Sequence, residues 1–368
     1  MRSEDDRRFF CEHRAAALSP NTPELVATAC APVGCRGLPK IISLFSGAGG
    51  LDLGFKQAGF IVSVAVDVAD AAIRTHKRNF PRTLAKVGDL IQLQPEGVVN
   101  IVREKLEPRQ RIAVIGGPPC QGFSRANTAS LSDDPRNKLP DLYLQIVEAL
   151  QKSYEVEFVV FENVLGIRDR KHIATFTALK TGITRLGFDV TEQELCATDF
   201  GVPQKRRRVI LAGLRCGQGY GEFQTRKRSG PQTVQDAIGN LKEPAYFQYG
   251  LDSEQFPEHP NHWTMQPRSP RFKNPEASTS DGRSFKRLLW DEASPTIAFG
   301  HREIHVHPSG RRRLSIYEAL LLQGFPSTFV LEGNLSEQVE QVSNAVPPPL
   351  ARSLANAMKR ALQGAGRG

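Results

Sequence analysis

Short apolar runs alternate with helical stretches from residue 40 onward, and this alternation constrains the fold more than any other feature of the sequence. Continuous apolar runs of strand length occupy residues 40–45, 61–66, 112–116 and 158–161. Apolar residues recur at helical spacing in four neighbouring stretches, residues 51–58, 69–79, 139–154 and 173–186. Strands that are apolar throughout are buried on both faces. The pattern predicts an α/β fold with a mostly parallel, doubly wound sheet.

The second half of the chain has a different texture. Two more strands are expected at residues 189–196 and 208–212, as an antiparallel pair at one edge of the sheet. From residue 216 to about 289 the periodicity disappears, and helical order returns at 315–323 and 348–362. Long irregular stretches inside a compact enzyme are usually functional. The predicted units are a poorly ordered leader (1–37), a catalytic and cofactor-binding domain (38–215), a smaller irregular domain (216–334) and a helical segment that returns to the catalytic domain (335–368).

Composition narrows the classes of protein and partner. The chain is 40% hydrophobic and 24% charged, which is typical of a globular protein. No apolar run approaches the roughly 18 residues of a membrane span, so no membrane association is expected. Lys and Arg number 48 against 39 Asp and Glu, which leaves a formal net charge of +9. This surplus favours anionic partners, with nucleic acid first.

The first 36 residues contain no pattern of a signal or transit peptide. Acidic residues occupy positions 4–6, and no apolar stretch of signal-peptide length follows. We therefore expect a cytoplasmic protein whose cysteines remain thiols unless they bind metal. The residues of this segment that suggest a zinc site are Cys11, His13, Cys30 and Cys35. Their spacing matches no ordinary zinc finger, so no metal is predicted.

The segment from Ile42 to Phe55 has the composition of a strand, a glycine-rich turn and a helix. Its glycines at positions 47, 49 and 50 let a ligand approach the backbone, and the helix amino end favours a carboxylate or phosphate. Asp67 follows at the end of the next strand, where an acid typically binds ribose hydroxyls. Taken alone, the segment is equally consistent with a dinucleotide site, and a tight turn without a ligand stays possible.

The loop Gly116-Gly-Pro-Pro-Cys-Gln-Gly-Phe-Ser124 presents one cysteine at the carboxyl end of a predicted strand. Open α/β sheets bind and react at this end of their strands. Because rigid loop residues surround Cys120, we predict that it is a nucleophile. Glu162 ends another buried strand and would meet Cys120 if the two strands are neighbours. A buried carboxyl group beside a nucleophile suits proton donation, although a salt-bridged or helix-capping glutamate is the alternative.

The basic segment Gln204-Lys-Arg-Arg-Arg208 leads into an apolar strand. In an extended chain Gln204, Arg206 and Arg208 share one face, while Lys205 and Arg207 share the other. One face can therefore enter a polar site while the second face meets solvent or phosphates.

These motifs resemble those of the DNA cytosine-5 methyltransferases, and the resemblance covers residues 40–362. The motifs occur in the family's order: Phe45-Ser-Gly-Ala-Gly-Gly50, Asp67, Gly88-Asp-Leu90, Pro118-Pro-Cys120, Glu162-Asn-Val164, Gln204-x-Arg-x-Arg208, Arg313-Leu-Ser-Ile-Tyr-Glu-Ala-Leu-Leu-Leu-Gln-Gly-Phe-Pro326 and Asn344-Ala-Val-Pro347. The resemblance implies a Rossmann-like, S-adenosylmethionine-dependent methyltransferase domain, with a smaller target-recognition domain.

The resemblance also implies which residues hold the cofactor. Phe45 would stack on the adenine, Asp67 would bind the ribose, and Asp89 would bind the adenine amino group. The other implied cofactor residues are Gly47, Gly49, Leu90, Pro118, Leu139, Asn344 and Val346. The helix amino end would then face the methionine carboxylate. Asp67 stands where the family usually has glutamate, and the shorter side chain is still expected to reach the hydroxyls.

For the reaction, the resemblance implies that the Cys120 thiolate adds to carbon 6 of a cytosine flipped out of the duplex. Glu162 would engage N3 and the exocyclic amine, and Arg208 with Arg206 would hold O2. Loss of the carbon 5 proton and of the cysteine would then give 5-methylcytosine.

The irregular region 216–290 would read the DNA sequence. Gln204, Arg226, Lys227 and Arg228 are the predicted contacts to double-stranded DNA, on which the enzyme would act as a monomer associated with the nucleoid. Two alternatives stay open, an RNA cytosine-5 methyltransferase of the kind that modifies transfer RNA, and a non-catalytic nucleic-acid-binding relative. The setting is either a restriction–modification system with a separately encoded endonuclease or that of an orphan methyltransferase.

Overall fold

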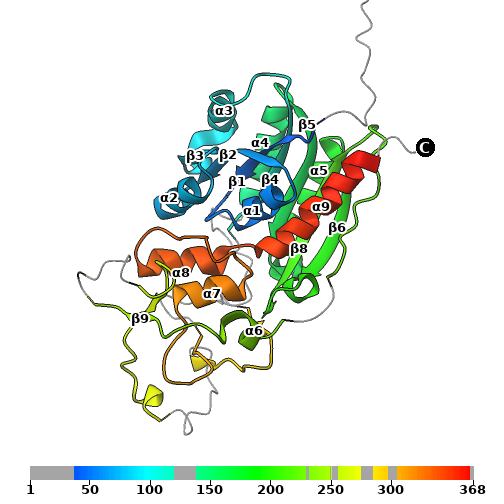
Figure 1. The fold of residues 1–368 in the computed structure, drawn as a ribbon. Coiled ribbons are helices and arrows are strands. Elements are labelled where there is room, and N and C mark those ends of the chain that lie inside the picture. The colour runs from blue at the N-terminus through cyan, green and yellow to red at the C-terminus, as the bar shows by residue number, and fades with distance from the viewer. Residues whose placement is uncertain are drawn as a thin grey trace, which may run out of the picture.

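The computed structural model describes residues 37–119, 138–228, 232–248, 250, 256–274, 285–296 and 305–364. Its centre is a seven-stranded sheet with helices on both faces (Figure 1). The strands, in their order across the sheet, are β3 (Leu84–Val87), β2 (Ile61–Asp67), β1 (Lys40–Leu44), β4 (Arg111–Gly116), β5 (Glu155–Asn163), β8 (Arg207–Arg215) and β6 (Phe188–Cys196).

The direction of the strands agrees with the sequence prediction. Neighbouring strands from β3 to β5 are parallel, whereas β8 is antiparallel to both β5 and β6. The predicted α/β fold, with a mostly parallel sheet and an antiparallel edge, is confirmed. The chain proceeds outward from β1 to β3 and then crosses to β4 on the other side of β1. Ligand sites of open α/β sheets form at such a reversal of strand order.

The apolar strand runs serve two cores, because alternate residues point to opposite faces of the sheet. The helices around the sheet are α1 (Gly50–Gln57), α2 (Asp70–Asn79), α3 (Leu90–Arg103), α4 (Leu139–Gln151), α5 (Ile173–Arg185) and α9 (Pro348–Gly364). Val114 and Val159 pack on the face that α3, α4 and α5 cover. Ala113 and Phe158 pack on the opposite face, under α1 and α9. Burial on both sides explains why most residues of these strands are apolar.

Two elements of the sheet region have no counterpart in the sequence prediction, β3 and α3. β3 is a short edge strand, and of its residues only Ala85 is fully buried. The helical pattern of α3 is interrupted because Gln94 has a φ of +55° and Pro95 follows it. A proline inside a helix removes a backbone donor and breaks the regular spacing.

The remaining elements are short, and α6, α7 and α8 lie together beside the sheet (Figure 1). They are β7 (Gln204–Lys205), α6 (Val234–Ile238), β9 (Ala245–Tyr246), β10 (Trp263–Thr264), β11 (Ser294–Pro295), α7 (Ile316–Leu322) and α8 (Leu335–Asn344), with 3-10 turns at Leu165–Arg168, Ala197–Phe200 and Pro270–Phe272. Their apolar core also includes Ala48, Leu53 and Phe80 from the beginning of the sheet region.

Segments near the predicted domain boundaries have mixed contacts. The chain after β8 packs along α9, where Gly221 N donates to Ala361 O (2.9 Å) and Ser353 Oγ donates to Arg226 O (3.0 Å). The predicted C-terminal helical segment contains two helices, of which α8 packs on α2 and α7 while α9 packs on α1. The four predicted units and their boundaries therefore stay predictions.

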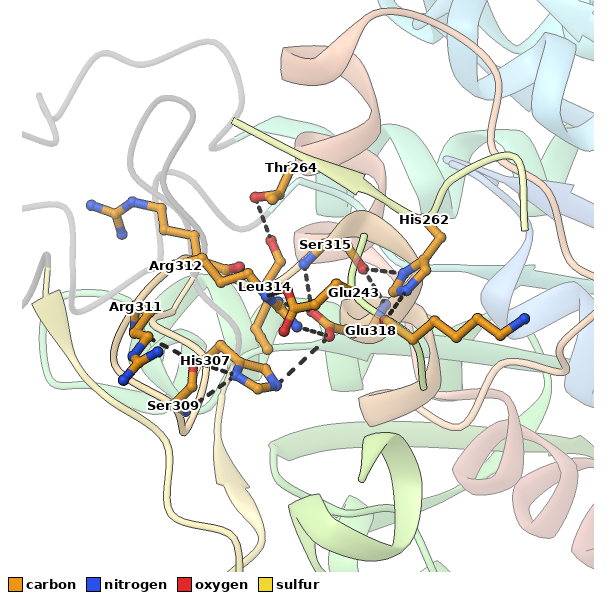
Figure 2. Close-up of polar contacts among 12 residues, drawn as sticks. Glu243, His262, Thr264, His307, Ser309, Arg311, Arg312, Leu314, Ser315 and Glu318 are labelled. Atoms are coloured by element: carbon orange, nitrogen blue, oxygen red, sulfur yellow. Dashed lines mark hydrogen bonds and ion pairs between the residues drawn. The ribbon is translucent and has the colours of Figure 1, made fainter. Parts of the chain in front are cut away.

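A cluster of charged residues around the buried Arg312 connects the turn before α7 to that helix (Figure 2). Arg312 is 3% exposed and forms two hydrogen bonds of 2.9 Å with the carboxylate of Glu318, while its Nε donates to Glu243 (2.7 Å). Ser315 and Glu318 also cap α7 reciprocally. Buried charges are tolerated when they are paired in this way.

Among the residues that the structure describes, no helix is long and apolar enough to cross a membrane.

Candidate active site

A cavity of about 560 Å³ lies at the carboxyl ends of the parallel strands. Its wall comes from the residues that follow β1 to β5, from the start of β8, and from α8 with the segment after it. Sites for small organic ligands have volumes of this size and lie at this end of open α/β sheets. We call the part lined by Glu162, Arg206 and Arg208 the target side, and the part lined by the segments after β1, β2 and β3 and by α8 the cofactor side.

The turn after β1 has a backbone conformation that glycine tolerates best. The φ angle is +52° at Gly47 and +90° at Gly49, and Phe45 also has a positive φ of +53°. A phenylalanine in this region is strained, and such residues cluster at ligand sites. Asp67 at the end of β2 stabilises the turn, because its Oδ2 accepts a hydrogen bond from Gly47 N at 2.8 Å.

The next two glycines permit close packing. A Cβ on Gly50 would overlap the carbonyl oxygen of Val346, and a Cβ on Gly49 would lie 2.6 Å from the ring of Phe80. Gly50 thus lets the amino end of α1 touch the backbone that follows α8, and both sides of this contact line the cavity. Gly49 does not appear in the cavity wall. The predicted contact of Gly49 with the cofactor is therefore not seen in the cavity wall. Gly49 instead precedes the first residue of α1 and packs against the ring of Phe80 and against His76 of α2.

Two carboxylates at the cofactor side are held by backbone donors. Asp67 accepts from Gly47 N and also from Ala69 N, the latter at 2.9 Å. Burial raises the pKa of the Asp67 carboxyl above its ordinary value, against the lowering effect of these donors. Asp89 caps α3 by accepting from Ile91 N at 2.9 Å with Oδ1. Its second oxygen has no hydrogen bond to any described residue.

The cofactor side offers both polar and apolar partners for a ligand. Ser46 is 9% exposed, and its Oγ has no hydrogen-bond partner within the described part of the chain. A buried hydroxyl of this kind is usually satisfied by a ligand or by water. Val68 and Ile91 are large apolar residues, 64% and 40% exposed, in the same wall. A flat aromatic group such as adenine would cover their exposed surface.

The structure brings most of the predicted cofactor residues into one wall. Those that line the cavity are Phe45, Gly47, Asp67, Asp89, Leu90, Pro118, Leu139, Asn344 and Val346. Sequence reasoning missed Ser46 and Val68, although each directly adjoins a predicted residue. It also missed Ser343 and Glu340 on α8, for which no local pattern in the sequence gives a signal.

The target side is built around an ion pair between two neighbouring strands. Arg208 Nε on β8 lies 2.7 Å from Glu162 Oε1 on β5, and both side chains are 9% exposed. Glu162 also lies beside the loop after β4, because a Cβ on Gly117 would lie 2.7 Å from Glu162 Oε2. Asn163 Nδ2 donates to Pro118 O at 3.2 Å. The carboxylate of Glu162 is thus brought to the loop that leads into Cys120.

The basic segment before β8 alternates as the sequence predicts. Gln204, Arg206 and Arg208 are buried, whereas Lys205 and Arg207 are exposed. Arg206 Nη2 donates to Ser343 O at 2.9 Å, so this arginine connects the target side to the end of α8. Gln204 is fully buried, is not part of the cavity wall, and its amide has no hydrogen-bond partner among the described residues.

Other predicted residues lie at the surface or outside the described ranges. Cys120 is outside the described residues, as are the four residues that suggested a zinc site. Arg226, Lys227 and Arg228 are exposed, and Lys227 Nζ lies 3.2 Å from Asp199 Oδ2. In the described ranges, no three His, Cys, Asp or Glu side chains are grouped closely enough to hold a metal ion.

Comparison with known proteins decides what kind of site this is. Residues 39–360 match the family model for the C-5 cytosine-specific DNA methylases. The chain belongs to this family. It is 34% identical over 347 residues to the Type II methyltransferase M.MthTI of Methanothermobacter thermautotrophicus, covering 88% of this chain and 98% of that protein. It is also 34% identical over 330 residues to the Type II methyltransferase M1.HphI of Haemophilus parahaemolyticus, covering 86% of each.

Solved structures show the same fold. A putative DNA modification methyltransferase encoded within a prophage of E. coli superimposes with a TM-score of 0.73 and 26% identity, covering 88% of this chain and 99% of that one. A variant of Spodoptera frugiperda DNMT2 superimposes with a TM-score of 0.60 at 18% identity, over 88% and 100% of the two chains. The second likeness concerns the fold alone.

Membership of this family identifies the reaction and the ligand of the cavity. The chain is a DNA cytosine-5 methyltransferase with a Rossmann-like fold, and its methyl donor is S-adenosylmethionine. The cofactor side fits this group, because Val68 and Ile91 offer apolar surface. The hydroxyl of Ser46 and the second carboxylate oxygen of Asp89 have no hydrogen bond to any described residue and could bond to the ligand.

Proposed function

We propose that the chain methylates carbon 5 of a cytosine that is flipped out of double-stranded DNA, through a transient covalent bond to Cys120. The observation that carries the proposal is the Glu162–Arg208 ion pair, which shares one cavity with the cofactor side. A base inside a duplex cannot present carbon 6 to a thiolate, so the target must leave the base stack.

The cofactor would bind along the wall formed by the ends of β1, β2 and β3. Phe45, Val68 and Ile91 would enclose the adenine, Asp89 would accept from its amino group, and Asp67 would accept from the ribose hydroxyls. The amino end of α1 provides backbone N–H groups and a partial positive charge for the methionine carboxylate. When bound, S-adenosylmethionine supplies an electrophilic methyl group attached to a sulfonium.

Cys120 would make carbon 5 reactive. Its thiolate adds to carbon 6, and the ring electrons move toward carbon 5 and N3. Pro118 and Pro119, whose rings restrict φ, directly precede the cysteine in the sequence. After methylation, the carbon 5 proton leaves to a base, the carbon–sulfur bond breaks, and the ring double bond re-forms with the thiolate released.

Glu162 and Arg208 would stabilise the charge that this addition creates. Glu162 holds N3 and the exocyclic amine, where its carboxyl group can share or donate a proton. Arg208 uses Nε for Glu162 and Nη1 for Arg207 O, and its other N–H groups stay available for the cytosine O2. Donors already fixed in place cost little reorganisation during the reaction. Arg206 would support this arrangement from Ser343.

Sequence recognition would come from the region 216–290, which would read base edges, while Arg226, Lys227 and Arg228 would hold phosphates. Gln204, which is fully buried, stays a predicted DNA contact. The relatives named above are Type II methyltransferases. We therefore propose a role in a restriction–modification system whose endonuclease is encoded separately. This methyltransferase would act on DNA as a monomer, in the cytoplasm and at the nucleoid.

The test compares the wild type with Cys120→Ser. Turnover on DNA should fall by three or more orders of magnitude, because oxygen replaces the nucleophilic sulfur, while binding of S-adenosylmethionine stays within about twofold. Cys216→Ser is the matched control, since Cys216 is an exposed thiol outside the cavity wall. DNA with 5-fluorocytosine at the target should trap the wild type covalently, since fluorine cannot leave as a proton does.

Bisulfite sequencing of DNA from cells that express the wild type would identify the target sequence. Turnover of Cys120→Ser within tenfold of the wild type would remove Cys120 from the mechanism. Methyl transfer to RNA in place of DNA would contradict the proposed substrate, and the absence of a covalent adduct on fluorinated DNA would contradict the thiolate addition.

A further inference from the structure

The cofactor side of the cavity carries an excess of acidic side chains. The carboxylates in its wall belong to Asp67, Asp70, Asp89, Glu337 and Glu340. The wall has two cationic side chains, of which Arg208 pairs with Glu162 and Arg206 donates to the backbone oxygen of Ser343. Ser46, which is 9% exposed, lies in the same wall, and its hydroxyl has no hydrogen-bond partner among the described residues, which points independently to a ligand there. A ligand with net positive charge fits this environment.

Glu340 differs from the other acidic residues of the wall. Backbone N–H groups bond to three of them, and Arg74 pairs with Asp70. Glu340 lies in the C-terminal half of α8 and is exposed, and its carboxylate makes no hydrogen bond or ion pair with any described residue. The carboxyl end of α8, which also lines the cavity, adds a partial negative charge. Glu340 therefore contributes a negative charge that no described cation neutralises.

The methyl transfer removes a positive charge from the ligand of this cavity. S-adenosylmethionine carries a sulfonium, an ammonium and a carboxylate, so its net charge is positive. The methyl group leaves with the positive charge of the sulfonium, and the product S-adenosylhomocysteine is a neutral thioether with a net charge of zero. An uncompensated carboxylate attracts the first ligand more strongly than the second.

We infer that Glu340 is a specificity-determining residue that raises the affinity of the cavity for the cationic cofactor relative to the product of the reaction. The inference rests on the proposed function, because it concerns the ligand of the same cavity. It assigns α8 a part in product release, since the product loses one attraction that the cofactor has. The ratio of the affinities for the cofactor and the product, which sets how strongly the product competes, should therefore depend on Glu340.

Calorimetry on the full chain without DNA tests this directly. The ligands are S-adenosylmethionine, S-adenosylhomocysteine and sinefungin, in which a carbon with a protonated amine replaces the methylated sulfonium. In Glu340→Gln the affinity for the two cationic ligands should fall by about threefold to tenfold, the effect of one unit charge at a partly exposed position, while the affinity for S-adenosylhomocysteine stays within about twofold. The loss should diminish at high ionic strength, because salt screens exposed charges.

Glu148→Gln is the matched control, because Glu148 is exposed on α4 and is not part of the cavity wall. Equal losses for all three ligands would show a contact that does not depend on charge, and would overturn the inference. Unchanged binding of all three ligands would overturn it as well. If the wild type bound neither S-adenosylmethionine nor its product, the proposed function itself would fail, an outcome distinct from a change confined to the variant.

Discussion

Gly50→Ala should separate the architecture of the cofactor wall from the stability of the fold. The new Cβ would lie less than 3.0 Å from Val346 O, a backbone atom, with the Phe325 ring and Val346 N within 3.3 Å. Normal contact requires the two backbones to separate by roughly 1 Å. Overpacking of this kind costs about 1–3 kcal/mol, and the better helix propensity of alanine returns at most about 1 kcal/mol. A net loss of about 1–2 kcal/mol is expected.

The displacement falls on the cofactor wall, because Gly50 and Val346 both line the cavity. The affinity for S-adenosylmethionine should therefore decrease by about tenfold, which corresponds to about 1.4 kcal/mol. Urea denaturation measures the loss of stability, and calorimetry measures the dissociation constant.

Gly59→Ala is the matched control. Gly59 has a φ of +96°, so alanine is strained there by about 1–2 kcal/mol, yet its Cβ would meet only Lys359 Nζ at 3.5 Å, and it lies outside the cavity wall. It should lose similar stability with unchanged affinity for the cofactor. If Gly50→Ala bound the cofactor within twofold of the wild type, or if the two variants lost the same affinity, the contact between α1 and Val346 would not shape the site.

Three further outcomes are expected. Arg208→Ala should reduce methylation by at least about a hundredfold with little change in the salt dependence of DNA binding. Arg207→Ala, on the exposed face of the same strand, should retain activity within about threefold. Steady-state kinetics would show the reverse if the two faces were assigned wrongly. Arg226→Ala should weaken binding to all duplexes and shallow the salt slope by roughly one unit, as measured by titration from low to moderate salt, and an unchanged slope would remove Arg226 from the phosphate contacts. Burial lowers the pKa of His259 and of His307 from 6.5 to about 4, so the unfolded chain takes up these protons first as the pH falls. The stability that is present above pH 6.5 should therefore decrease by up to about 3 kcal/mol per histidine by pH 4. Urea midpoints that stay constant from pH 7 to 4.5 would contradict this.

The sequence predicts the features that depend on local pattern. The apolar runs predict the parallel strands because burial on both faces favours apolar residues along most of their length. The alternation of Gln204, Arg206 and Arg208 with Lys205 and Arg207 predicts which side chains are buried, because the period of a strand is two residues. The resemblance assigns Glu162 and Arg208 to the same cytosine, and the two side chains lie together because each is at the site end of a strand and these strands are neighbours.

The features that the sequence does not reveal depend on contacts between distant segments. Gly50 touches Val346, and Thr75 Oγ1 donates to Gln341 Oε1 at 2.6 Å, although each pair is separated by more than 260 residues. The position of Glu340 in the cavity wall follows from the packing of α8 on α2, to which no periodicity points. α3 is missed for the opposite reason, since its own irregularity at Gln94 hides a helix that the tertiary structure stabilises. The role of Cys120 and the reading of DNA by the region 216–290 stay predictions.

The contact between Gly50 and Val346 has a consequence for protein synthesis. The ribosome produces β1, the glycine turn and all the other strands of the sheet well before it reaches Asn344 and Val346. A nascent chain that has folded only its sheet therefore lacks the second wall of the cofactor cavity, and it gains this wall only after the region predicted to read DNA has been made. A chain whose translation stops before Asn344 should therefore bind the methyl donor weakly. Truncated chains that lack the region predicted to read DNA would then be unable to methylate DNA.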